Sequence, residues 1–80
     1  MSLGRAMVTA SRFYQASAAG PPGDPGVKSV GITVEDDAGW RHEQVVYIQA
    51  GTAAHELEQL NYAVENLMKA HGKVGPWRWA

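Results

Sequence analysis

The sequence predicts an α+β fold in which one helix packs on one face of a three-stranded antiparallel sheet, in the order strand, strand, strand, helix. Two stretches of alternating apolar residues separated by a turn indicate a hairpin, and a later stretch has helical periodicity. Each of these elements has one apolar face that must be buried, so the helix is expected to cover the sheet. We expect residues 1–80 to form a single domain.

A first strand is predicted over residues 5–16, because Val8, Phe13 and Tyr14 favour strands and no helical apolar stripe fits this stretch. Apolar residues occur in both alternating sets, so the register of this strand stays open. Residues 17–26 (SAAGPPGDPG) contain three of the four prolines, which predicts a loop. This loop is either a surface connection or a mobile binding loop.

Residues 27–50 are predicted to form an antiparallel hairpin that turns at residues 35–39 (EDDAG). Side chains alternate between the two faces of a strand, so apolar residues at every second position share a face. On the inner face of the hairpin the sequence places Val30, Ile32, Val34, Val46 and Ile48.

A helix is predicted over residues 53–71, with Thr52 as its N-terminal cap and Gly72 as its stop. Steps of three and four residues place a core-facing stripe along it, consisting of Leu57, Leu60, Val64, Leu67 and His71. Each aliphatic side chain buried there stabilises the fold by roughly 1.5–3 kcal/mol before entropy is subtracted. The tail, residues 74–80, is judged too short to form an element of its own.

Composition narrows the class of protein. The chain has no cysteine, so it has neither disulfides nor thiolate metal sites, and no stretch is apolar enough to span a membrane. We therefore expect a cytoplasmic protein. Its net charge of −1 differs from the cationic excess of most nucleic-acid-binding domains.

The histidines do not form a recognised metal or catalytic motif. His55-Glu56 resembles the start of the zinc-protease sequence HExxH, but Gln59 stands where the second histidine ligand is needed. No nucleophile flanked by glycines accompanies His42. We expect no enzymatic activity, no cofactor and no metal.

Three groups of residues could contact a partner. Tyr47 is predicted on the outer face of the sheet, which is either an interface, including one for homodimerisation, or is covered by the tail. Trp77, Arg78 and Trp79 combine the residue types enriched at binding hot spots, although such a tail can also dock on the core. Carboxylates that could steer a cationic partner are Glu35, Asp36, Asp37, Glu58 and Glu65.

In size and composition the chain resembles the small inhibitor proteins of phages and mobile elements, including anti-CRISPR proteins. This resemblance implies a protein that blocks a nucleic-acid-handling effector, such as a CRISPR complex, by occupying a cationic site. The anchors would be Tyr47, Trp77, Arg78 and Trp79, and the steering charges would be Glu35, Asp36, Asp37, Glu58 and Glu65.

Two alternatives remain beside this hypothesis. The element order is also similar to that of small DNA-reading domains such as the AP2-type plant domains, which implies a nucleic-acid-binding domain that reads through its sheet. The strands offer few cations for that purpose beyond Arg12, Lys28 and Arg41. The other alternative is a structural protein that forms homodimers.

Overall fold

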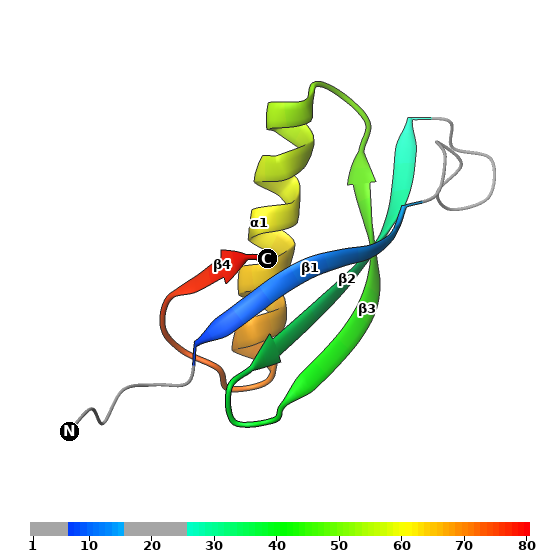
Figure 1. Cartoon of the computed structure of the whole chain (residues 1–80). Helices are drawn as coiled ribbons and strands as arrows, with labels where there is room; N and C mark the ends of the chain where they lie inside the picture. The colour runs from blue at the N-terminus through cyan, green and yellow to red at the C-terminus, as the bar shows by residue number, and fades with distance from the viewer. Residues whose placement is uncertain (1–6, 16–25) are drawn as a thin grey trace.

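A mixed sheet of four strands carries one helix across a single face in the computed structural model, which describes residues 7–15 and 26–80 (Figure 1). The elements are β1 (Val8–Gln15), β2 (Val27–Asp36), β3 (Arg41–Gln49), α1 (Ala53–Ala70) and β4 (Trp77–Trp79). The strands lie in the order β3-β2-β1-β4. The first three are antiparallel neighbours, and β4 runs parallel to β1. The α+β class with one helix is confirmed.

The prediction of a purely antiparallel, three-stranded sheet was wrong in one respect, because the tail adds β4. Gly72 and Gly75 have positive φ angles of 68° and 119°, which glycine adopts readily, and the chain passes through them on its way to the edge of β1. There the N–H of Ala80 donates to the carbonyl of Ala10 at 2.8 Å. Three residues are too few for a periodic pattern, so this strand depends on the edge that β1 offers.

The hairpin of β2 and β3 agrees with its prediction. Asp36 closes the turn, since its Oδ1 accepts hydrogen bonds from the N–H groups of Ala38 and Trp40, each at 2.9 Å. The register pairs Val30 with Val46 across the inner face. The three β2 residues predicted for that face, Val30, Ile32 and Val34, are all fully buried.

Helix α1 begins as predicted and ends one residue earlier. The Thr52 hydroxyl accepts a hydrogen bond from the N–H of His55, which caps the first turn. Leu60, Val64, Leu67 and Met68 are the buried residues of α1.

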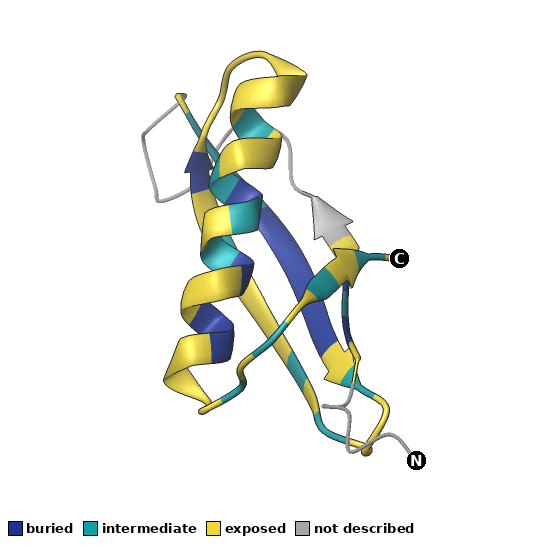
Figure 2. Cartoon of the chain, turned by 90° about the vertical axis from the view of Figure 1, so that its left-hand side faces the viewer, coloured by how far each residue is buried: buried dark blue, intermediate teal, exposed yellow. Residues whose placement is uncertain are grey.

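Two members of the predicted stripe are outside the core: Leu57 is 40% exposed and His71 is also exposed. They lie at the two ends of the helix, which are largely exposed in Figure 2. Periodicity identifies the face of a helix but not how far the sheet beneath it extends.

The structure sets the register of β1, which the sequence left open, and shows a bulge in this strand. Val8 and Ala10 are buried on the helix side, but the pairing with β2 shifts between Arg12 and Tyr14. Phe13 lies on the opposite face, as alternation from Val8 and Ala10 requires, and it packs against Gly31, where an added Cβ would come within 2.7 Å of the Phe13 ring. The predicted loop covers residues 17–26, of which residues 17–25 lie outside the described residues. No helix in the described ranges has the length and apolarity needed to cross a bilayer.

Candidate protein-binding surface

The two C-terminal tryptophans are built into the sheet and still reach its surface. Trp77 and Trp79 alternate with Arg78, so their side chains share the helix side of β4. Their rings meet edge to face with centroids 5.4 Å apart, and both are partly buried against the core. The indole Nε1 of Trp79 donates to Oδ1 of Asn61 in α1 at 2.7 Å. These contacts fix the position of both rings beside the helix.

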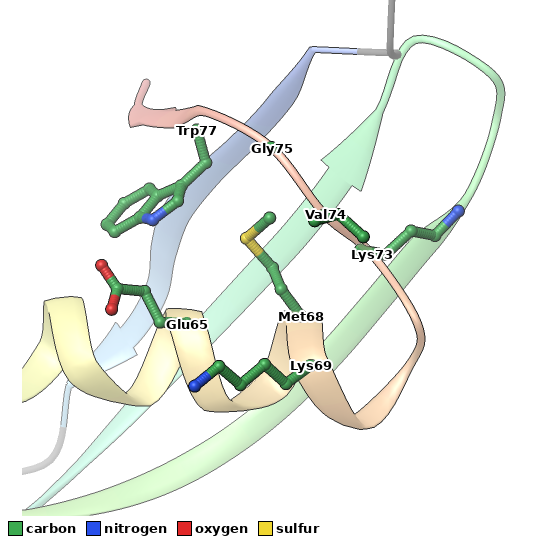
Figure 3. A pocket seen from close by; sticks show the side chains of 7 residues that line it. All are labelled: Glu65, Met68, Lys69, Lys73, Val74, Gly75 and Trp77. Atoms are coloured by element: carbon green, nitrogen blue, oxygen red, sulfur yellow. The ribbon is translucent and has the colours of Figure 1, made fainter.

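Two hollows lie along this side of α1. The first has a volume of about 210 Å³ and is shown in Figure 3; its lining residues are Glu65, Met68, Lys69, Lys73, Val74, Gly75 and Trp77. The second has a volume of about 400 Å³ and is lined by Glu58, Gln59, Asn61, Tyr62 and Glu65. Glu65 lines both hollows and therefore joins them. In Figure 3 the Glu65 carboxylate extends towards the Trp77 indole, whereas Lys73 points away from it.

We call the surface formed by Glu58, Tyr62, Glu65, Trp77 and Trp79 the α1–β4 face. Glu58 and Glu65 are exposed, and neither forms one of the ion pairs found among the described residues. Tyr62 is 68% exposed. Lys69 stands at the C-terminal end of this surface. The face therefore presents free carboxylates next to aromatic rings.

Of the three carboxylates in the β2–β3 turn, Asp36 is turned inward. Its side chain is only 3% exposed and forms an ion pair with Lys73 at 3.0 Å. The hydrogen bond from Lys73, together with the turn hydrogen bonds from Trp40 and Ala38, lowers the pKa of the Asp36 carboxyl. Glu35 and Asp37 are exposed, and Asp37 accepts a hydrogen bond from the N–H of Met7 at 3.2 Å. Asp36 therefore stabilises the turn and its contact with Lys73, while Glu35 and Asp37 face solvent.

Tyr47 lies on the helix-free face of the sheet, far from the two tryptophans. The register places Tyr47 on the same face as Val45. Val45 pairs with Gly31, and the Phe13 ring covers Gly31 on this face. No described segment covers this face, because the tail extends the edge of the sheet instead (Figure 1). Since β3 and β4 form opposite edges, Tyr47 and the tryptophans cannot belong to one compact site.

The residue that breaks the HExxH pattern has a structural role. The Gln59 side chain accepts a hydrogen bond from the N–H of Gln49 at 2.7 Å and donates one to its carbonyl at 2.8 Å. The neighbouring Glu56 carboxylate pairs with Lys28 at 2.8 Å and also accepts the N–H of Gly51. The hydrogen bond from Lys28, followed by that from Gly51, lowers the pKa of Glu56.

The described residues contain no group of three or more potential metal ligands among histidine and the acids. His42 and His71 do meet, with ring centroids 4.5 Å apart, and His71 also contacts Trp40. These rings pack the end of the helix against β3. The sequence did not predict this contact, because the two histidines belong to different elements.

The predicted partner-binding residues therefore occupy separate places. Glu58, Glu65, Trp77 and Trp79 come together on the α1–β4 face. Arg78 is exposed on β4 but points away from that face, Tyr47 lies on the open face of the sheet, and Glu35 and Asp37 lie at the turn. Sequence reasoning missed Asn61, whose link to Trp79 follows only from the position of β4. Comparisons with protein-family models, curated proteins and solved structures found no match.

Proposed function

We propose that this chain is a non-enzymatic protein-binding module that acts through the α1–β4 face. One observation carries the proposal: Glu58, Glu65 and Trp77 line two hollows that share Glu65, and Trp79 adjoins them through its contacts with Trp77 and Asn61. Binding hot spots are enriched in aromatic residues held in well-packed surroundings. Trp77 and Trp79 fit this description because their rings are already ordered against the core.

The charge of this face favours a cationic partner. Arginine and lysine side chains bind carboxylates through charge-assisted hydrogen bonds and are attracted to the faces of tyrosine and tryptophan rings. Glu58 and Glu65 supply the carboxylates, and Tyr62 lies between them on the helix. The positive charge of Lys69 repels cations at the other end of the face, so a cationic partner should bind closer to Glu58.

In finer detail, the module is a small inhibitor that blocks a nucleic-acid-handling effector such as a CRISPR complex. Such an effector holds nucleic acid in a cationic groove, which an acidic and aromatic surface can occupy. The resemblance in size and composition to phage-encoded inhibitors supports this assignment. Direct nucleic-acid binding through the sheet is less favoured, because Lys28 and Arg41 are already paired with Glu56 and Glu43.

Co-purification with the tagged chain tests the proposal. Tyr62→Ala and Glu58→Lys change exposed side chains of α1, so the fold should be retained. We expect Tyr62→Ala to weaken partner binding about tenfold or more, as truncation of a hot-spot residue does. Tyr47→Ala is the matched control, because Tyr47 is also a highly exposed tyrosine (59%) but lies on the open sheet face. A partner that is lost with Tyr47→Ala and kept with Tyr62→Ala would contradict the proposal.

The inhibitory step needs a second measurement. Addition of the chain to the purified partner should reduce the partner's binding of labelled nucleic acid, and Glu58→Lys should restore it. A shift of labelled DNA or RNA by the chain alone, with strong salt dependence, would instead support the nucleic-acid-binding alternative.

A further inference from the structure

The outer edge of β3 has unpaired backbone groups along most of its length. Alternate residues of a strand direct their N–H and C=O groups to opposite sides. The carbonyl of Trp40 accepts from Asp36, and the N–H of Ala50 donates to Gly26, so even-numbered residues face β2. The groups of the odd-numbered residues therefore face the open edge of the sheet, and these residues are Arg41, Glu43, Val45, Tyr47 and Gln49.

Among residues 7–15 and 26–80, contacts close only one end of this edge. The Gln59 amide bonds both backbone groups of Gln49, as a neighbouring strand would. The remaining four residues, from Arg41 to Tyr47, each keep one N–H and one C=O directed outward. Sheet edges are usually protected by proline, by a bulge or by charged side chains, especially lysine. β3 contains no proline, lysine or bulge, and its two charged residues, Arg41 and Glu43, neutralise each other in an ion pair. The opposite edge, β4, is only three residues long.

We propose that a second copy of this chain pairs with this edge, β3 against β3, in antiparallel orientation about a two-fold axis. An antiparallel edge is complementary to itself under such an axis. One register satisfies all of the outward groups: Arg41 lies opposite Tyr47 of the second copy and Glu43 lies opposite Val45 of the second copy. This pairing joins two four-stranded sheets into one continuous sheet.

Side chains favour that register over its neighbours. Arg41 opposite an aromatic ring gains a cation–π contact, and the Arg41–Glu43 pair within each strand can persist. A shift by two residues in one direction places Glu43 opposite Glu43 of the second copy, where like charges repel. A shift in the other direction moves Arg41 opposite Gln49, whose backbone groups are already bonded.

The helix side of the edge has room for the added strand. A hollow of about 290 Å³ lies between β3 and α1, and its lining residues are Gln44, Val46, Ala63, Asn66, Leu67, Ala70 and His71. In the proposed register, Gln44 meets Gln44 of the second copy at the two-fold axis, where the two amides can hydrogen-bond. Val46 of the second copy lies beside His42 at the margin of this hollow. The hollow therefore receives inward-facing side chains of the second copy.

This inference goes beyond the proposed function and does not depend on it. The α1–β4 face belongs to the opposite edge of the sheet and stays open in such a dimer. A protein that dimerises without binding a partner, or that binds a partner as a monomer, would separate the two proposals.

Sedimentation of the purified chain from about 10 µM to about 1 mM tests the pairing. We expect the mass to rise with concentration from 8.6 kDa towards twice that value. Val45→Pro should abolish the rise, because it removes an outward N–H and no bond to β2. Val45→Lys is a second variant, which changes only an exposed side chain and should also prevent pairing. Tyr62→Lys is the control and should dimerise normally.

Amide hydrogen exchange locates the interface. In the dimer the N–H groups of Glu43, Val45 and Tyr47 should exchange at least about tenfold more slowly than in dilute solution, while those of Trp77 and Trp79 should not change. A monomer at every concentration would overturn the proposal, as would a dimer that persists in both Val45 variants. Protection of these amides only after another protein is added would also overturn it, and would assign the edge to that protein.

Discussion

The two edges of the sheet are held in place by different means. β3 pairs with β2 along its entire length, and its backbone ladder needs little help from side chains. β4 has only three residues paired with β1, and it is held by two tryptophan side chains packed on the core, of which Trp79 also donates a hydrogen bond to Asn61. β3 does not need its outer-face side chains for attachment, and Tyr47 is 59% exposed there, whereas Ile48 on the inner face belongs to the core. β4 is instead attached through its two tryptophans, so the aromatic rings of the α1–β4 face are positioned by contacts with the core and with Asn61.

Truncation of one aromatic residue at each edge of the sheet should give the largest difference in unfolding free energy between the two edges. Trp79→Ala removes ring packing and leaves Asn61 without its donor, so we expect a loss of about 2–4 kcal/mol in unfolding free energy. Tyr47→Ala should cost less than about 0.5–1 kcal/mol, because that ring is mostly exposed. Urea unfolding measures both values. Equal losses would show that β4 does not depend on its side chains.

Substitution of Gly31, on the open face of the sheet next to β3, should have a smaller effect on stability. The Phe13 ring occupies the place of a Cβ at this position, so Gly31→Ala must move the end of that ring. In the Phe13→Ala background the steric conflict is absent, and Gly31→Ala should stabilise the chain by about 0.5–1 kcal/mol, since glycine weakens strand interiors. In the presence of Phe13 the same substitution should give less stabilisation or a loss. A double-mutant cycle measures the difference, and additive effects would place Phe13 elsewhere.

Acid should lower the stability of the fold through the Lys73–Asp36 ion pair. This pair joins the connection between α1 and β4 to the β2–β3 turn. Folding lowers the pKa of Asp36, so this contribution is present above the unfolded pKa of about 3.9 and is lost as the pH falls through the lower folded value. Asp36→Asn can keep the turn acceptor and loses the charge, so it should remove this part of the pH dependence. Carboxyl NMR titration should find the Asp36 pKa below its ordinary value and closer to it in Lys73→Met.

The Glu56–Lys28 ion pair, at the other end of the helix, is the matched comparison for the Lys73–Asp36 pair. The pKa of Glu56 is also lowered, here by Lys28, so Glu56→Gln should remove a separate part of the acid sensitivity. Tryptophan fluorescence should report the Asp36 transition more strongly, because Trp40 lies 4.8 Å from the Lys73 ammonium. Identical fluorescence responses in the two variants would contradict a local role for the Lys73–Asp36 pair.

Local sequence patterns predicted the elements that their own residues specify, such as β2 and α1. Alternation placed Val30, Ile32 and Val34 correctly on the inner face, and the Thr52 cap located the start of the helix. β4 and the bulge at Phe13 could not be predicted, because each depends on a neighbouring strand rather than on its own sequence. The same limit applies to the surface: the sequence named Glu58, Glu65, Trp77 and Trp79 but could not show that they share a face.

Site-specific photocrosslinking tests the central claim, that the α1–β4 face is the binding surface, most directly. A photoreactive phenylalanine analogue replaces Tyr62 in one protein and Tyr47 in another; both tyrosines are highly exposed and lie on different faces. Irradiation in the native cell lysate should produce a discrete crosslinked partner from position 62, and Glu65→Lys in the same chain should abolish it. A discrete partner other than a second copy of this chain, captured from position 47 and not from position 62, would contradict the account.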